Sequence, residues 1–230
     1  MKNYLSKIYI IHYTKLEDRK KHMLSEIEKW SMNRIPVHFE ERHDQEVMSQ
    51  FDIYQLINNQ KFKQNTGREI KNGEASLCLK YKQILEDVNT LSDDEYVLIL
   101  EDDVIFKQDP FEYINSIIDK CDNENIDFDC VFMGEAALRV GDNRDVFYRK
   151  EHPATNGLCT VLYKVKSAKK VLNSLNLFQI DNALDWHFNN VFRDLNFNVY
   201  WGKAITEHGS VLAVHDKSRV GLKSALRDRY

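Results

Sequence analysis

The 230-residue sequence has few of the residues that interrupt or cross-link a fold, with three prolines, eight glycines and four cysteines. The cysteines are far apart and form no CxxC pair, which argues against a disulfide framework or a zinc site and predicts reduced, mostly buried thiols. Linkers, internal repeats and collagen-like segments are also missing. We therefore predict one domain spanning residues 1–230.

Long apolar runs and a charge excess are lacking as well. The amino-terminal KIYIIHY run is too short for a signal peptide or an anchor, and no stretch is long enough to span a bilayer. A net charge of −4 argues against a general nucleic-acid-binding protein. Hydrophobic residues make up 43% of the chain, enough for a sizeable core. These properties predict a cytoplasmic globular protein whose partners are not nucleic acids.

What stands out is the stretch EYVLILEDDVIF at residues 95–106, in which an apolar run ends in three acids, Glu101, Asp102 and Asp103. Such a run is typical of a central strand covered on both faces. Three carboxylates at its carboxyl end are costly unless a positive group lies beside them. Ligands bind at this edge of open α/β sheets, so the pattern favours a divalent cation and a phosphate-bearing substrate. The alternative is an exposed acidic turn.

The rest of the chain alternates between strand and helix patterns, which predicts an α/β fold with a mainly parallel sheet. The predicted strands are 7–13, 36–41, 96–100, 127–133, 156–165 and 198–205, and the predicted helices are 14–30, 72–88, 111–121, 167–175 and 180–193. Residues 140–152 fit a hairpin or an irregular insertion. Residues 45–71 are interpreted as a variable surface insertion. The basic tail, residues 217–230, suits either an anionic acceptor or membrane surface or a solvated terminus.

Four further residues are candidates for chemistry. Arg19, after the first strand, could reach a phosphate or a base, or be an ordinary charged first turn. Asp181 and Asp185 are four residues apart and share a face if their segment is helical; Asp185, followed by Trp186, is the better general base, and Asp181 could instead cap the helix. His208 follows the last predicted strand and could bind a metal or be a solvated loop residue. His215 is the alternative metal ligand.

Several segments in order resemble glycosyltransferase family 25, which includes lipooligosaccharide galactosyltransferases and collagen-modifying enzymes. The matching stretches are IYIIHYTKLEDRKKHM, NGEASLCLKYKQI, VLILEDDVIF, FDCVFMGE, NGLCTVLYKVKSAKKVL, ALDWHF and the late HGS. The chain departs from the family pattern at Lys80-Tyr81, where a Ser-His pair is usual, and at Ala183-Leu184, where Pro-Val is usual.

The resemblance implies a GT-A fold with a Rossmann-like nucleotide-binding core, a nucleotide-sugar donor and inversion at the anomeric carbon. UDP-galactose is the expected donor, with UDP-glucose or another UDP-sugar as the alternative, and a saccharide or glycolipid is the expected acceptor. A Mn²⁺ or Mg²⁺ ion would neutralise the leaving diphosphate. The enzyme would then work in the cytoplasm, either free or at the inner face of the membrane.

Residue roles follow from this resemblance together with strand geometry. Glu101 and Asp103 share a face on an extended backbone, whereas Asp102 points away unless the strand turns. We assign Asp103 and His208 to the metal, and the donor-binding set is Glu101, Asp102, Arg19 and Ile11. Asp185 or Asp181 is the expected base. The competing interpretations are a metal-dependent phosphohydrolase and a non-catalytic partner subunit.

Overall fold

The computed structural model describes residues 4–135 and 147–209, and its centre is an eight-stranded sheet in the order β2-β1-β3-β7-β5-β8-β4, with β6 paired to β8. From the pairings, β1, β2, β3, β5 and β8 run in one direction and β4, β6 and β7 in the other. The predicted α/β class is confirmed. The strands are β1 (Leu5–Ile11), β2 (Val37–Glu40), β3 (Tyr96–Glu101), β4 (Val104–Phe106), β5 (Cys130–Gly134), β6 (Tyr148–Arg149), β7 (Thr160–Lys164) and β8 (Val199–His208).

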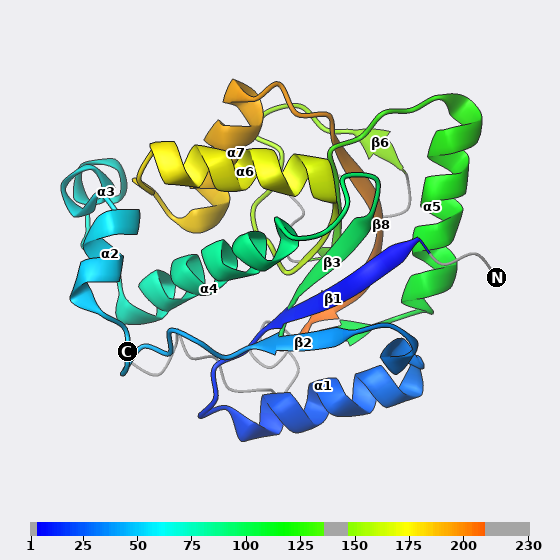
Figure 1. Ribbon diagram of the computed structural model, residues 1–230, viewed down its shortest axis with the longest axis horizontal. Helices are drawn as coiled ribbons and strands as arrows, with labels where there is room; N and C mark the ends of the chain where they lie inside the picture. The colour runs from blue at the N-terminus through cyan, green and yellow to red at the C-terminus, as the bar shows by residue number, and fades with distance from the viewer. Residues whose placement is uncertain (1–3, 136–146, 210–230) are drawn as a thin grey trace.

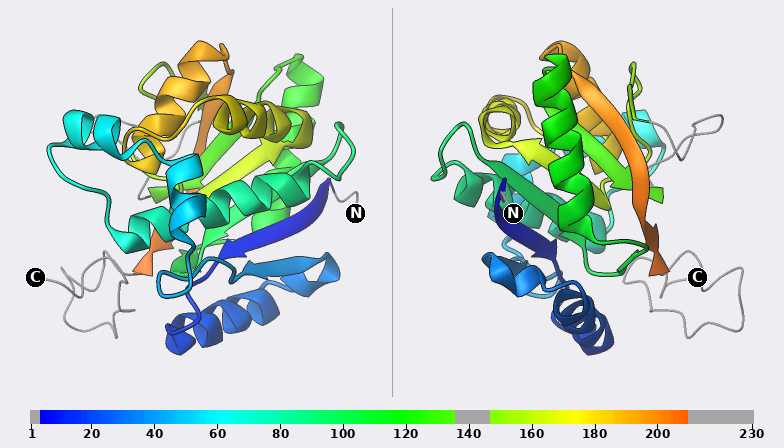
Figure 2. Two further views of the ribbon diagram at one scale, coloured as in Figure 1. Left: turned by 60° about the vertical axis from the view of Figure 1, so that its left-hand side comes forward. Right: turned by 90° about the vertical axis from the view of Figure 1, so that its right-hand side faces the viewer.

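Helices cover both faces of the sheet (Figure 1). One face carries α4 (Asn72–Val88), α6 (Val165–Leu177) and α7 (Leu184–Asp194). The other carries α1 (Glu17–Lys29) and α5 (Pro110–Glu124). A short 3-10 helix, η1 (Met32–Arg34), links α1 to β2. The two further views in Figure 2 show the sheet between these layers.

The side chains of β3 explain why the acidic stretch begins as an apolar run. Val97 and Ile99 pack into the core on the α4 side, whereas Leu98 and Leu100 pack into the core on the α1 side. All four are fully buried. Because both faces are covered, an uninterrupted apolar run is the favourable sequence here, as predicted.

Residues 45–71, which the sequence analysis interprets as a variable surface insertion, contain two helices. These are α2 (Gln50–Leu56), with Ser49 accepting from the Phe51 N–H, and α3 (Asn59–Thr66), with Asn58 accepting from the Lys61 N–H. Most of their side chains are exposed, but Phe62 is fully buried. The polar composition of the segment gave no sign that Phe62 would be buried. The segment also forms one wall of a cavity described below.

The structure adds one strand after the acidic stretch and corrects the predicted start of the helix that bears Asp185. The chain turns at Asp102 and Asp103, so Val104–Phe106 is a separate strand, β4, antiparallel to β8. Helix α7 begins at Leu184 and not at Ile180. Ile180 is instead held extended beside Ile57: its N–H donates to the Leu56 carbonyl at 2.8 Å and its carbonyl accepts from the Asn58 N–H at 2.9 Å. A residue bonded in this way cannot also begin a helix.

Some predictions fall on residues outside the described ranges. These are the tail 217–230, His215, and most of the proposed hairpin at 140–152, of which β6 is described. A search of the described helices found none with both the length and the apolar character needed to cross a bilayer.

Candidate active site

The candidate site lies where β1 and β3 end at the same edge of the sheet. The two strands are parallel, and Ile11 stands opposite Glu101 in their register. Ile11 is buried, with its side chain in the core on the α4 side. The residues that directly follow these two strands are His12 and Asp102, and their side chains are in contact. This edge is where ligands bind in open α/β sheets.

Arg19 lies against the two aspartates of the turn, and we call Asp102, Asp103 and Arg19 the acidic turn cluster. Its guanidinium places Nη1 2.5 Å from Asp102 Oδ1 and Nη2 2.9 Å from Asp103 Oδ2. Asp102, Asp103 and Arg19 are 4%, 1% and 8% exposed. The sequence argument required a positive group beside these acids, and within the described residues Arg19 is that group.

His12 adds a second contact that the sequence analysis did not single out. Its Nδ1 lies 2.7 Å from Asp102 Oδ2, and its ring is fully buried. Burial opposes ionisation of Asp102, but the hydrogen bond from His12 and the charge of Arg19 outweigh it and lower the pKa of this carboxyl. The sequence offered little signal for this contact, because the predicted strand 7–13 included His12, whereas β1 ends at Ile11 opposite Glu101.

His208 comes close to the acidic turn cluster through its backbone. In the β4–β8 register His208 stands opposite Val104, and the Gly209 N–H donates to the Asp103 carbonyl at 2.7 Å. The end of β8 is therefore hydrogen-bonded to the aspartate that we assign to the metal. The His208 side chain lies outside the described part of the structure.

Glu101 faces a different space from its two neighbours. It lines a cavity of about 160 Å³ together with Glu74 and Asp185, and the remaining walls are mainly apolar. We call this the carboxylate cavity. Its other lining residues are Phe62, Ile70, Leu77, Cys78, Gly157, Leu158, Asn182, Ala183 and Leu184. The structure thus brings together Glu101 and Asp185, which are 84 positions apart (185 minus 101).

Asp185 has an unusual electrostatic environment within this cavity. Burial, chiefly, and then the charges of Glu101 and Glu74 raise its pKa. The Trp186 N–H donates to Asp185 Oδ1 at 2.9 Å, which partly opposes the shift. The Trp186 side chain is 39% exposed. A carboxylate with a raised pKa in a partly apolar cavity is suited to accept a proton.

Glu74 differs from Asp185 because it has a cation beside it. Arg68 contacts both of its carboxylate oxygens, at 2.7 and 2.6 Å, and the Lys71 N–H donates to it at 3.0 Å. Burial works against ionisation here, but these partners lower the pKa of Glu74 overall. Glu74 was seen in the sequence only as part of the NGEASLC segment, and the fold gives it a place in the cavity.

Asp181 does not share a face with Asp185, because it precedes α7. Its Oδ1 lies 3.1 Å from His187 Nδ1, and its carbonyl accepts from Asn65 at 2.9 Å. It lines a separate cavity of about 440 Å³ with His187 and Asn58. Glu135, directly after β5, is 2.9 Å from Lys107, which also contacts Glu207 at 3.3 Å.

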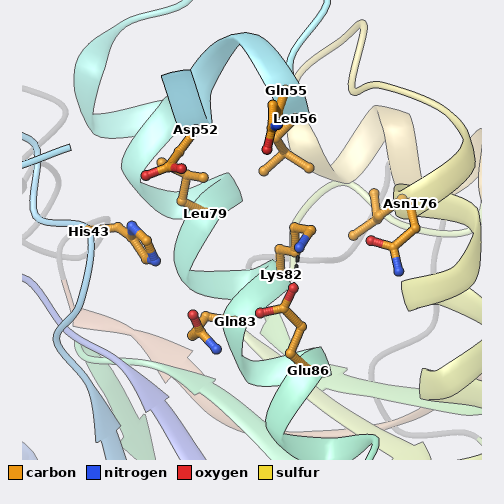
Figure 3. Close-up of a pocket in the computed structure, with 10 residues that line it drawn as sticks. His43, Asp52, Gln55, Leu56, Leu79, Lys82, Gln83, Glu86 and Asn176 are labelled. Carbon is orange, nitrogen blue, oxygen red and sulfur yellow. Dashed lines mark hydrogen bonds and ion pairs between the residues drawn. The ribbon is translucent and has the colours of Figure 1, made fainter. Parts of the chain in front are cut away.

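A wider groove of about 550 Å³ runs between α2, α4 and α6 (Figure 3). It is lined by polar groups from all three helices over the leucines 56, 79 and 175, and Lys82 pairs with Glu86 at its centre. None of the predicted site residues is among those that line it.

One further cluster of possible metal ligands shares no residue with the acidic turn cluster or with the carboxylate cavity. Within the described ranges, His38, Glu40 and Asp87 are the residues whose ligand atoms come within 4.8 Å of one another. Arg42 joins this cluster, since it binds Glu40 through several hydrogen bonds and lies 3.2 Å from Asp87. The Arg42 guanidinium already pairs with both carboxylates, so we interpret the cluster as an ion-pair network.

Comparison with known proteins identifies the family. A family model described as "Glycosyltransferase family 25 (LPS biosynthesis protein)" matches residues 5–184, which include the acidic turn cluster and end one residue before Asp185. A search of curated proteins gave no match. Among solved structures, one similar chain is described as a glycosyltransferase involved in the glycosylation of the major capsid of PBCV-1, at 12% identity and a TM-score of 0.42, covering 88% of this chain and 91% of that one.

Proposed function

Because the chain belongs to glycosyltransferase family 25, we propose that it transfers a hexose from a UDP-sugar to a saccharide acceptor in lipooligosaccharide or other surface-glycan synthesis. Galactose is the sugar that we propose, transferred with inversion to a β linkage. We also propose that the enzyme works in the cytoplasm, with its basic tail (residues 217–230) reaching an anionic acceptor or the inner membrane face.

One observation carries this proposal: the carboxylates of the acidic turn cluster and the Asp185 carboxylate of the carboxylate cavity lie in opposite electrostatic environments. Asp102 and Asp103 lie against Arg19, whereas Asp185 has no ion pair within the described residues and shares its cavity with Glu101. Transfer from a nucleoside diphosphate sugar needs both environments: a cation-rich place for the leaving diphosphate and a proton acceptor for the attacking hydroxyl.

The donor side is the acidic turn cluster. Asp103 and His208 offer a carboxylate and an imidazole, which are ligand types that suit Mn²⁺; Mg²⁺ would rely more on the carboxylate and on phosphate oxygens. One oxygen of Asp102 contacts His12 and the other contacts Arg19. Asp102 is therefore better placed to orient Arg19 than to bind a metal ion. A bound divalent cation would supply charge neutralisation for the diphosphate. Arg19 would add a second positive group. The Ile11 side chain lies in the core and Glu101 lines the carboxylate cavity, so the donor contacts expected of these two residues would come from their backbone at the strand ends.

The acceptor side is the carboxylate cavity. An acceptor hydroxyl oxygen would attack the anomeric carbon and form the new glycosidic bond, while the bond from that carbon to the diphosphate oxygen breaks and UDP leaves with the electron pair. The hydroxyl proton would pass to the Asp185 carboxylate, whose raised pKa favours accepting it. The exposed Trp186 ring offers an apolar face for the acceptor sugar.

A thermal-shift screen of nucleotide sugars with and without Mn²⁺ tests this function. A ligand that binds the folded state raises the apparent melting temperature by mass action. We expect UDP and UDP-galactose to raise it only when Mn²⁺ is present, and GDP-sugars to leave it unchanged. A shift with GDP-sugars in place of UDP-sugars would refute the donor class, and release of free galactose as the sole product with every saccharide acceptor tried would favour a hydrolase.

A further inference from the structure

Lys80 is a buried charge in an otherwise mainly apolar face of α4. It is 2% exposed, and the neighbouring buried residues of this helix include Leu79, Tyr81 and Ile84. A lysine ammonium is costly to bury unless its hydrogen-bonding groups are satisfied. Replacing a whole buried ion pair with apolar residues is often neutral or stabilising, so the reason for a lysine here is to be sought in what its ammonium contacts.

The Lys80 ammonium joins three chain segments at the edge of the sheet. It donates to the His12 carbonyl at 2.7 Å, to Asp44 Oδ1 at 2.6 Å, and more weakly to the Glu40 carbonyl at 3.4 Å. His12 directly follows β1, Glu40 ends β2, and Asp44 lies in the loop after β2. One ammonium therefore fixes the ends of two strands and the loop between β2 and α2.

Two of these contacts, to His12 and to Asp44, lead to the side chains that bind the aspartates of the acidic turn cluster. His12, whose carbonyl Lys80 binds, directs its imidazole to Asp102. Asp44, which Lys80 neutralises, accepts hydrogen bonds from the Thr14 backbone N–H at 3.2 Å and from the Thr14 hydroxyl. Thr14 begins the short segment into α1, and the first turn of that helix carries Arg19. Lys80 is thus connected to His12 directly and to Arg19 through Asp44 and Thr14.

We propose that Lys80 is a positioning residue for donor binding, which holds His12 and the segment bearing Arg19 against Asp102 and Asp103. This inference rests on the proposed function, because the donor diphosphate is the ligand that the acidic turn cluster would receive. Lys80 itself is buried behind the cluster and acts through these neighbours.

Titration of UDP in the presence of Mn²⁺ tests this role. The variant Lys80→Met/Asp44→Asn removes the ion pair without leaving either charge buried alone, and the introduced amide keeps an acceptor oxygen for Thr14. We expect it to fold and to bind UDP about tenfold more weakly or worse, the scale seen when groups that orient a binding site are removed. Leu85→Ala is the matched control: it truncates a fully buried side chain of the same helix, so it should lower the melting temperature without changing UDP affinity.

A second variant covers the case in which the double variant does not fold. Thr14→Val removes the hydrogen bond from the Thr14 hydroxyl to Asp44 and leaves the Lys80–Asp44 ion pair intact. We expect a smaller loss of UDP affinity with little change in melting temperature. Wild-type affinity in either folded variant would overturn the positioning role alone. Failure of the wild-type protein to bind UDP would overturn the proposed function, and this inference with it.

Discussion

Two groups of carboxylates lie side by side at the end of β3 and differ in what surrounds them. Asp102 and Asp103 are almost fully buried, yet Arg19 and His12 lower the pKa of Asp102. Asp185 is less buried, but burial and the nearby Glu101 and Glu74 raise its pKa. Opposite shifts at neighbouring carboxylates often mark opposite roles in catalysis. The first group suits binding of an anion through cations, and the second suits proton transfer.

The largest expected effect comes from breaking the first group. Asp103→Asn keeps the size of the side chain and removes its charge, so the site would lose its proposed metal ligand and one partner of Arg19. We expect transfer to be abolished and the fold to be retained, because this buried site is costly to stability. Activity assays on the variant, and on the wild-type enzyme in EDTA, check this.

The control for that variant is Asp94→Asn, which makes the same change at an exposed position between α4 and β3. It should leave activity unchanged. Full activity in Asp103→Asn, or in wild-type enzyme with EDTA, would show that the acidic turn cluster is not the donor site.

The next effect concerns the second group. Asp185→Asn removes the proposed base, and we expect kcat to fall by about 10²-fold or more, the scale of general-base catalysis. Since only the ionised form accepts a proton, kcat of the wild-type enzyme should also decline as the pH is lowered through the raised pKa of Asp185. Asp181→Asn is the matched variant, because Asp181 faces His187 in a separate cavity. A larger loss in Asp181→Asn would move the base to that residue.

A smaller effect is expected from His208→Ala. If His208 is the second metal ligand, its loss should raise the Mn²⁺ concentration needed for half-maximal activity several-fold while added metal restores turnover. Metal titrations of the wild-type and variant enzymes measure this. The structure places His208 in β8 and not in the predicted loop. An identical metal dependence would show that His208 is not a metal ligand.

The smallest effect is on stability, and its sign distinguishes the two groups. The pKa of Asp185 is higher in the native state than in the unfolded chain, where it has its usual value of 3.8. Asp185 therefore lowers the free energy of unfolding as the pH rises from 3.8 through the raised native pKa. Asp185→Asn should therefore be slightly more stable than wild type at neutral pH, with the gain lost below pH 3.8. Asp102→Asn should have the opposite sign, because a lowered pKa stabilises the native state above the usual value. Urea titrations across pH test both.

Much of this arrangement could be predicted from local sequence patterns. The apolar run before Glu101 predicted a central strand, and its abrupt end in three acids predicted a site. The predicted common face of Glu101 and Asp103 was wrong, because Asp102 and Asp103 both contact Arg19 while Glu101 lines the carboxylate cavity. The chain turns at Asp102 and sends Val104–Phe106 to pair with β8, a strand about 100 residues later. The start of α7 was likewise set by a bridge between Ile180 and Ile57. His12 and Glu74 entered the site through such long-range packing.

Titration of UDP in the presence of Mn²⁺ into Asp103→Asn and Asp185→Asn tests the division between the two groups most directly. The account predicts that Asp185→Asn binds UDP as the wild-type protein does, while turning over slowly, and that Asp103→Asn shows no measurable binding. Equal affinities in the two variants, or loss of UDP binding in Asp185→Asn alone, would contradict it.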